Sequence, residues 1–262
     1  MSLPGFSIEQ HTILDQTRDV YRRGNGPAVV VLSEIPGITP QVAAFASRVA
    51  DAGFSVWMPQ LFGTPGKPLS LSYAGQMLLR MCISKEFSVF AANKSSPVVH
   101  WLRGLARIAH EQCGGPGVGV VGMCITGNFG LSMMLDAPVI APVLSQPSLL
   151  AGLGGAMSAL HASPAEIDAA HDKIRKHGAR ILGLRFVQDP LCTGRRFDRL
   201  RDEFGDAFEG IEIDARHARK VPGMPAHSVL TTHLIDEAGE PTRQALDRTL
   251  AFLREQLGKR SG

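Results

Sequence analysis

Cysteine is scarce in this chain and long apolar runs are absent. The four cysteines among 262 residues follow neither the spacing of a metal site nor the pattern of a small disulfide-stapled protein. Every apolar run stops within a few residues at a glycine, a proline or a charge, which excludes a membrane-spanning helix. The first residues also lack the charged and apolar segments of a secretion signal. We therefore expect a cytoplasmic protein with reduced thiols and no membrane association.

An excess of charge of one sign is absent too. The net charge is +3, and basic residues alternate with acidic ones along the chain, so no nucleic-acid surface is predicted. With 44% hydrophobic and 19% charged residues, the chain can bury a core without disulfides or metal. We expect one domain over residues 1–262, in which two irregular segments, about 63–96 and 148–162, cover a pocket.

Strand-like and helix-like segments alternate along the chain. Fully apolar runs of this kind are typical of central parallel strands, and the segments between them have helical spacing. Predicted strands are residues 28–32, 54–59, 118–121, 139–144, 180–187 and 210–214, and predicted helices include 41–52, 97–112, 128–135 and 241–257, with another after the N-cap Ser163. This pattern predicts an α/β fold with a mostly parallel central sheet and helices on both faces.

The segment from Gly122 to Gly127 predicts a sharp turn between a strand and a helix, with Cys124 at its apex. Such a turn exposes a nucleophile in a strained conformation, and it needs small residues on either side. The following helix would place its N-terminus beside the thiolate and favour the charge. The alternative is a buried structural cysteine at a strand end.

Two further residues are predicted at the same edge of the sheet, where ligands bind in open α/β sheets. Asp189 follows the strand 180–187, and His227 lies in the loop before the last helix. An imidazole can take the proton of a thiol, and a carboxylate fixes the tautomer of the imidazole. Asp189 also suits a simple turn before Pro190. His217 and His233 are alternatives to His227 as the histidine that takes the thiol proton.

The loop after the strand 28–32 predicts an oxyanion site. Acyl transfer needs amide donors from the residue after the nucleophile and from this loop, which would be Ile125 and Ile35. Pro36 has no N–H and cannot donate a hydrogen bond to the oxyanion. Glu34 at this strand end is costly to bury, so it either faces water or contacts the Cys124 thiol or a substrate and tunes ionisation.

These residues resemble the dienelactone hydrolase family of α/β-hydrolases. The resemblance rests on the loop 34–39, on residues 52–62, on Gly122-Met123-Cys124, on Asp189 and on Ala226-His227-Ser228, and it covers about residues 28–257. It implies the α/β-hydrolase fold and a Cys124, Asp189 and His227 triad that cleaves esters or lactones through an acyl-enzyme. In this family the early glutamate, here Glu34, controls when the thiol ionises. No metal and no organic cofactor is implied.

Several positions depart from the family pattern. The family has a glycine at the position of Thr126, an aromatic residue at that of Pro36 and a glycine at that of Ala226. Thr231 stands where the family has an arginine that binds the substrate carboxylate. Arg80 is a candidate for a second such arginine. Residues 77–81 and 149–157 favour a more apolar pocket.

The sequence therefore predicts an ester or lactone hydrolase acting on a small molecule. Two alternatives stay open, a ligand-binding protein that keeps the fold without catalysis and an acyltransferase or thioesterase. The natural substrate and the oligomeric state are not predicted.

Overall fold

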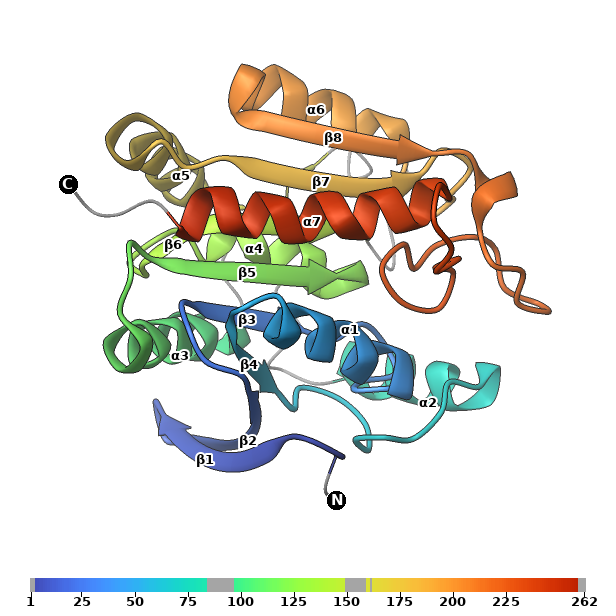
Figure 1. The fold of residues 1–262 in the computed structure, drawn as a ribbon, viewed down its shortest axis with the longest axis horizontal. Helices are drawn as coiled ribbons and strands as arrows, with labels where there is room; N and C mark the ends of the chain where they lie inside the picture. The colour runs from blue at the N-terminus through green and yellow to red at the C-terminus, as the bar shows by residue number, and fades with distance from the viewer. Residues whose placement is uncertain (1–2, 84–96, 149–158, 161, 259–262) are drawn as a thin grey trace.

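Eight strands form one sheet in the order β1-β2-β4-β3-β5-β6-β7-β8 (Figure 1). The computed structural model describes residues 3–83, 97–148, 159–160 and 162–258. β1 pairs antiparallel with β2, β2 pairs antiparallel with β4, and all other neighbours are parallel. The strands are β1 Ser7–Ile13, β2 Gln16–Arg23, β3 Ala28–Leu32, β4 Ser55–Pro59, β5 Val118–Met123, β6 Val139–Ser145, β7 Ile181–Phe186 and β8 Phe208–Ile213.

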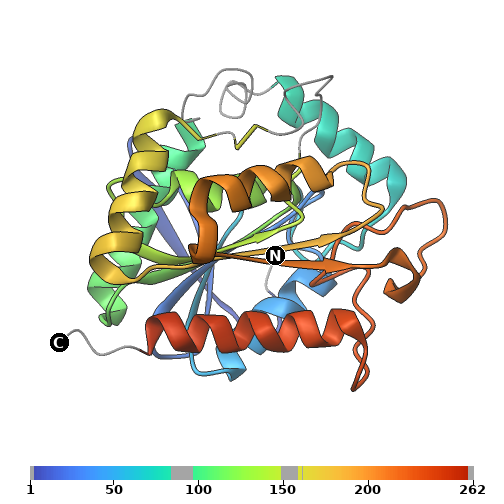
Figure 2. The same cartoon turned by 90° about the horizontal axis from the view of Figure 1, so that it is seen from above.

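Helices cover both faces of this sheet. Helices α1 and α7 lie on one face, and α3, α4, α5 and α6 lie on the other (Figure 2). The helices are α1 Pro40–Asp51, α2 Leu71–Ile83, α3 Pro97–Cys113, α4 Phe129–Ser132, α5 Pro164–His177, α6 Gly194–Phe204 and α7 Pro241–Leu257. The predicted fold class, a mostly parallel sheet between helices, is confirmed.

The central strands are buried along their whole length. Every residue of β3, β4, β5, β6 and β7 is buried, which explains why they read as continuous apolar runs instead of alternating ones. Their carboxyl ends meet at one edge of the sheet because the strands are parallel. The segments that follow β3, β5, β6 and β7 are thereby brought together, and they contain most of the predicted site.

Helix α5 begins at the predicted cap. The Ser163 hydroxyl accepts a hydrogen bond from the Glu166 amide, and the Glu166 carboxylate accepts one from the Ser163 amide, which makes a capping box. The helix ends at Gly178, whose φ of +59° gives the left-handed conformation common after helices.

The two predicted covering segments are described only in part. Residues 63–83 include α2, whereas residues 84–96, 149–158 and 161 lie outside the described residues, as does the whole of the predicted apolar stretch 149–157. Among the described helices, none combines the length and apolar character needed to cross a bilayer.

Candidate functional site

Cys124 lies at the turn where β5 ends. It begins a 3₁₀ turn, Cys124–Asn128, and its φ of +57° is in the left-handed region that side chains other than glycine rarely adopt. Two residues earlier, a Cβ on Gly122 would lie 2.2 Å from the Thr126 carbonyl oxygen. The turn therefore needs glycine there, and it places a cysteine in a strained conformation at its apex.

The segment after Cys124 is less regular than predicted. The expected helix over residues 128–135 is wrong in length, because the 3₁₀ turn is followed only by the short α4. Side chains in the preceding turn hydrogen-bond to its backbone and compete there with regular helical pairing. The Asn128 amide donates to the Ile125 carbonyl at 3.1 Å, and the Thr126 hydroxyl accepts from the Met123 amide at 2.9 Å.

Thr126 ties the turn to the neighbouring strand. Its buried hydroxyl lies 3.1 Å from the Leu32 carbonyl oxygen at the end of β3 and 2.8 Å from that of Met123. The side chain that departs from the family glycine thus finds hydrogen-bond partners in the turn and in β3.

His227 and Asp189 lie together at the same edge of the sheet. Nδ1 of His227 is 2.7 Å from Oδ2 of Asp189, whose side chain is buried. The other carboxylate oxygen accepts a hydrogen bond from the Leu191 amide at 2.9 Å. Asp189 therefore forms the turn that its sequence suggested and also orients an imidazole.

The Cys124 thiol also contacts this imidazole. Burial acts to lower the pKa of His227, but the charge of the Cys124 thiolate and the hydrogen bonds with Asp189 and Cys124 raise it well above its usual range. The described structure brings Cys124, His227 and Asp189 into one contiguous group.

The two competing histidines have different surroundings. His217 is half-buried and lies 3.5 Å from a carboxylate oxygen of Glu240. His233 is buried, and its Nδ1 accepts a hydrogen bond from the Ser228 amide at 3.1 Å. Burial, followed by the charge of neighbouring His227, lowers the pKa of His233 to about 4. His227 is the histidine that contacts Asp189.

The two predicted oxyanion donors follow neighbouring strands. Leu32 of β3 pairs with Gly122 of β5, and Ile35 and Ile125 lie equally far beyond that pair. The Ile35 amide donates to no backbone carbonyl among the described residues. The Ile125 amide belongs to the first turn of a helix, where N–H groups have no partner within the helix.

Glu34 is buried, so the interpretation that it faces water is wrong. Only 4% of the residue is exposed. Its carboxylate accepts hydrogen bonds from the hydroxyls of Ser228, at 2.6 Å, and Thr231, and from the Gln146 amide at 3.2 Å. Ser228 and Thr231 follow His227 in the chain, and none of the hydrogen bonds of Glu34 within the described residues goes to Cys124. Glu34 thus anchors the loop that carries His227.

Arg80 has no described contact with Cys124, His227 or Asp189. It is exposed near the end of α2 and forms no ion pair with a described residue. Nothing in the described structure brings it to Cys124.

Sequence reasoning missed several polar residues around the group. Gln146 follows β6 with a φ of +36°, directly beside Cys124 in the strand register, and Ser148 lies two residues further. Asn128, the last residue of the turn, and Arg196 of α6, which donates to it, are both buried. Gln146 and Ser148 follow a predicted central strand, and this position could have marked them as site residues. Arg196 could not be found in this way, because its role depends on the packing of α6.

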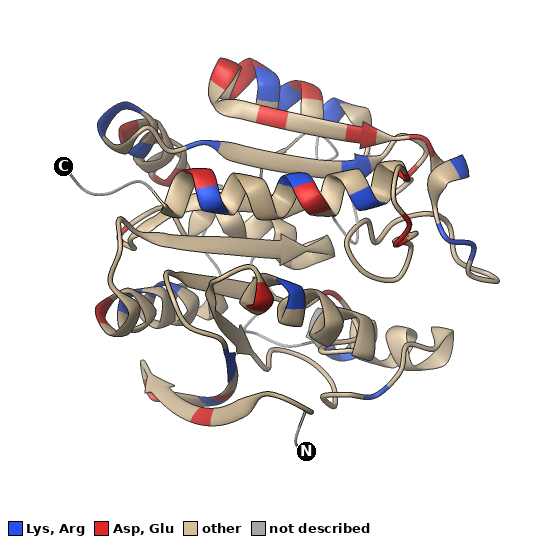
Figure 3. Ribbon diagram, viewed as in Figure 1, with Lys and Arg blue, Asp and Glu red and all other residues tan. Residues whose placement is uncertain are grey.

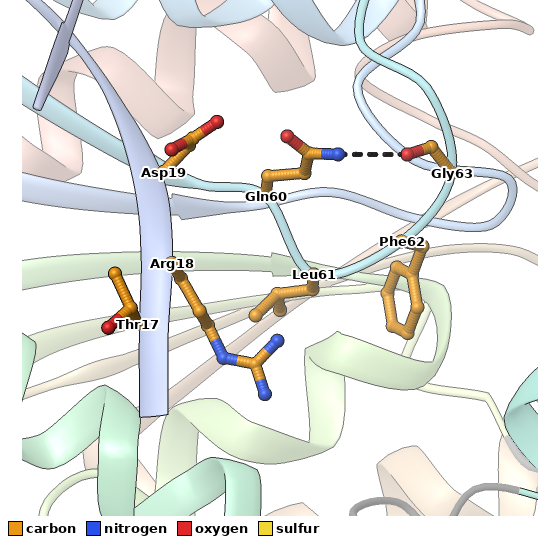
Figure 4. A pocket seen from close by; sticks show the side chains of 7 residues that line it. All are labelled: Thr17, Arg18, Asp19, Gln60, Leu61, Phe62 and Gly63. Atoms are coloured by element: carbon orange, nitrogen blue, oxygen red, sulfur yellow. Dashed lines mark hydrogen bonds between the residues drawn. The ribbon is translucent and has the colours of Figure 1, made fainter. Parts of the chain in front are cut away.

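A separate hollow of about 330 Å³ lies between β2 and the segment after β4. Figure 4 shows Arg18 reaching from β2, and Gln60 donating to the Gly63 carbonyl at 3.0 Å. None of the predicted site residues lines it. No group of three potential metal ligands occurs among the described residues.

Comparison with known proteins agrees with this architecture. Residues 18–214 match the dienelactone hydrolase family. No curated protein sequence matches the chain. A Klebsiella pneumoniae protein assigned as a dienelactone hydrolase is similar in structure, with 17% identity, a TM-score of 0.63 and coverage of 95% of this chain and 99% of that one.

Two proteins from metagenomic libraries are similar in fold as well. A dienelactone hydrolase-like promiscuous phosphotriesterase has 17% identity and a TM-score of 0.57, covering 97% of this chain and 100% of that one. A cold-adapted esterase from an Arctic intertidal library has 14% identity and a TM-score of 0.56, covering 98% and 97%. Identities this low establish the fold alone, but the family match spans most of the chain. The chain belongs to the dienelactone hydrolase family.

Proposed function

We propose that the protein hydrolyses a carboxylic ester or lactone of a small molecule through an acyl-enzyme on Cys124. The observation that carries the proposal is the contiguous group of a strained, turn-borne cysteine, an imidazole beside it and a buried carboxylate 2.7 Å from the far nitrogen. A thiol is a weak nucleophile until it loses its proton, and this arrangement supplies both the base and its orientation. The family match and an esterase of the same fold support the reaction class.

The first step is proton transfer and attack. Nε2 of His227 takes the thiol proton of Cys124, and Asp189 accepts the hydrogen bond from Nδ1–H and stabilises the imidazolium. The thiolate sulfur then bonds to the carbonyl carbon, and the carbonyl electron pair moves onto oxygen. The amides of Ile35 and Ile125 donate hydrogen bonds to that oxyanion.

The second step releases the alcohol and then the acid. When the tetrahedral intermediate collapses, the carbon–oxygen bond to the leaving group breaks, and Nε2–H of His227 protonates the alkoxide. Water then attacks the thioester carbonyl carbon while His227 takes a proton from it, the carbon–sulfur bond breaks, and the Cys124 thiolate regains a proton from His227. A different acceptor in place of water would give acyl transfer from the same intermediate.

The test is trapping of the acyl group. The native protein is mixed with a panel of activated esters and lactones, and product formation is followed together with the intact mass. We expect turnover of at least one compound and a transient acyl mass on the Cys124 peptide. Cys124→Ala loses the adduct and at least about a thousandfold of the rate, because nucleophile and base act as a unit.

Cys113→Ala provides the matched control, since Cys113 ends α3 away from the site. It is expected to keep both adduct and turnover, and both variants should unfold at nearly the same temperature as the native protein. Turnover that survives Cys124→Ala contradicts the proposal. Ligand-induced stabilisation without turnover of any compound would favour a binding protein, and acyl transfer products would favour a transferase.

A further inference from the structure

Ser148 uses every one of its polar groups at the site. Its amide donates to the Cys124 carbonyl at 3.1 Å, and its carbonyl accepts from the Asn128 side-chain amide at 2.7 Å. Its hydroxyl lies 2.7 Å from the Gln146 carbonyl and 3.5 Å from Nε2 of His227. The residue is 2% exposed, so these are its available partners within the described residues. Ser148 thus touches both the nucleophile turn and the imidazole.

The direction of these hydrogen bonds is fixed by their chemistry. A carbonyl can only accept, so the Ser148 hydroxyl donates its single proton to Gln146. The hydroxyl oxygen therefore presents lone pairs to Nε2 of His227, and it can accept a hydrogen bond only when Nε2 carries a proton. At 3.5 Å the contact is long, but hydrogen bonds in unliganded active sites are often long and tighten in the reacting complex.

We propose that Ser148 is a positioning residue whose hydroxyl accepts a hydrogen bond from Nε2–H of His227 after that nitrogen has taken the Cys124 proton. Ser148 thereby favours the thiolate and imidazolium over the neutral pair, and it holds the ring toward the sulfur. The inference rests on the proposed function, because it presumes that Cys124 and His227 exchange a proton.

Ser148 is itself held in place by a buried chain of contacts. The Asn128 side-chain amide donates to the carbonyls of Ile125 and Ser148, at 3.1 and 2.7 Å. The Asn128 oxygen accepts from the Arg196 guanidinium, which fixes which end of the amide points to Ser148. Helix α6 thus anchors Ser148 through Asn128. A small displacement of a positioned group is costly in catalysis, so this anchoring matters to the reaction.

Two neighbouring side chains, those of His233 and Cys192, keep one protonation state between pH 5 and 9. His233 is uncharged there because burial lowers its pKa to about 4. Burial, with the charges of Asp189 and Cys124, raises the pKa of the Cys192 thiol, so that it stays protonated. The remaining groups are the carboxylates of Asp189 and Glu34, which bond His227 and the following Ser228, and the Arg196 guanidinium behind Asn128. A midpoint in this range reports on Cys124 and His227.

The experiment measures the rate of Cys124 alkylation by iodoacetamide between pH 5 and 10, by peptide mass mapping. This readout needs no substrate. The native protein should have an alkylation midpoint below the free-thiol pKa of about 8.5. In Ser148→Ala the midpoint should rise by half a unit to one unit, so that alkylation at pH 6 is about threefold to tenfold slower. Ser148→Thr, which keeps the hydroxyl, should restore most of the native midpoint.

Ser33→Ala is the matched control. Ser33 is a buried serine after β3, at the same edge of the sheet, and its hydroxyl has no hydrogen-bond partner among the described residues. Its loss should leave the midpoint unchanged. An unchanged midpoint in a folded Ser148→Ala variant overturns the role of Ser148 alone. A native midpoint at or above that of a free thiol overturns the proposed function and this inference with it.

Discussion

His227 and His233 are six residues apart, yet their environments push their pKa values in opposite directions. The pKa of His227 is raised because the thiolate and Asp189 outweigh burial. The pKa of His233 is lowered to about 4 because burial dominates and His227 adds repulsion. Nδ1 of His233 accepts from the amides of Ser228 and His227, at 3.1 and 3.4 Å. The neutral ring thus holds the backbone of its catalytic neighbour in the proposed mechanism.

His233 should make the protein sensitive to mild acid. The unfolded histidine binds a proton below about pH 6.5, whereas the folded one binds it only below about 4. Between these values the unfolded state holds more protons, so the free energy of unfolding falls as the pH drops. We expect a loss of up to about 2 kcal/mol from this group, allowing for screening.

Urea unfolding of the native protein and of His233→Asn at pH 7 and 4.5 measures this loss. Asparagine keeps an acceptor but does not titrate, so the variant should lose less stability between the two pH values. His100→Asn, at an exposed position of α3, should behave like the native protein. Identical pH dependence in all three proteins would show that His233 does not control acid stability.

The residues of the proposed triad could be predicted from the sequence because each lies after a predicted strand or in a predicted loop at one edge of the sheet. Glu34 was less predictable. Its burial depends on hydroxyls of Ser228 and Thr231, which arrive from a loop almost 200 residues later. Ser148 and Arg196 were not predicted, because their contacts depend on how α6 and the end of β6 pack against the turn.

Regular elements were predicted more closely than irregular ones. The strand β3 and the helix α7 match their predicted bounds, and α1 differs by one residue at each end. The hairpin of β1 and β2 was missed, because its turn residues Leu14 and Asp15 both have positive φ, +49° and +60°, without the glycine that signals such a turn. The sequence analysis identified part of α2 as an apolar segment and did not predict a helix there.

The turn after β5 should be the element least tolerant of added volume. A Cβ at Gly122 would meet the Thr126 carbonyl at 2.2 Å, and backbone would have to move. We expect Gly122→Ala to cost at least about 2 kcal/mol of unfolding free energy, measured by urea denaturation, and to slow Cys124 alkylation.

Gly75 offers the comparison within a helix. A Cβ there has no neighbour within 4 Å, so Gly75→Ala in α2 should be neutral or stabilising by up to about 1 kcal/mol. If both substitutions have the same effect on stability, the tight approach at the turn is not what requires glycine.

A buried ion pair joins three helices on one face of the sheet. The guanidinium of Arg103 in α3 contacts the carboxylate of Glu166 in α5, and it also donates to the Ser132 carbonyl in α4 at 2.9 Å. The Ser132 hydroxyl completes the network, 3.1 Å from Glu166. Arg103 and Glu166 are 3% and 0% exposed, so neither charge is solvated by bulk water. The network fixes how these helices pack behind the site.

Loss of the negative charge from this network should destabilise the whole molecule. Glu166→Gln keeps the shape but leaves the guanidinium facing a neutral amide, and breaking a buried pair in this way costs about 3 kcal/mol or more. Urea denaturation measures the effect. Asp172→Asn in the same helix removes an exposed carboxylate that pairs with Lys176 at 3.1 Å, and it should change stability little. Equal effects would contradict the importance of burial.

β8 is an edge strand of the sheet, and acidic positions occur along it (Figure 3). Glu209 binds Arg248 of α7 at 2.6 Å, and Glu212 binds Arg201 of α6. An unpaired outer strand is a template on which a foreign strand can add, and aggregation begins in this way. Here the side chains of an added strand would lie beside Glu209 and Glu212, which are held in ion pairs. Charged side chains on an edge strand disfavour such addition, so β8 protects this side of the sheet without an additional strand.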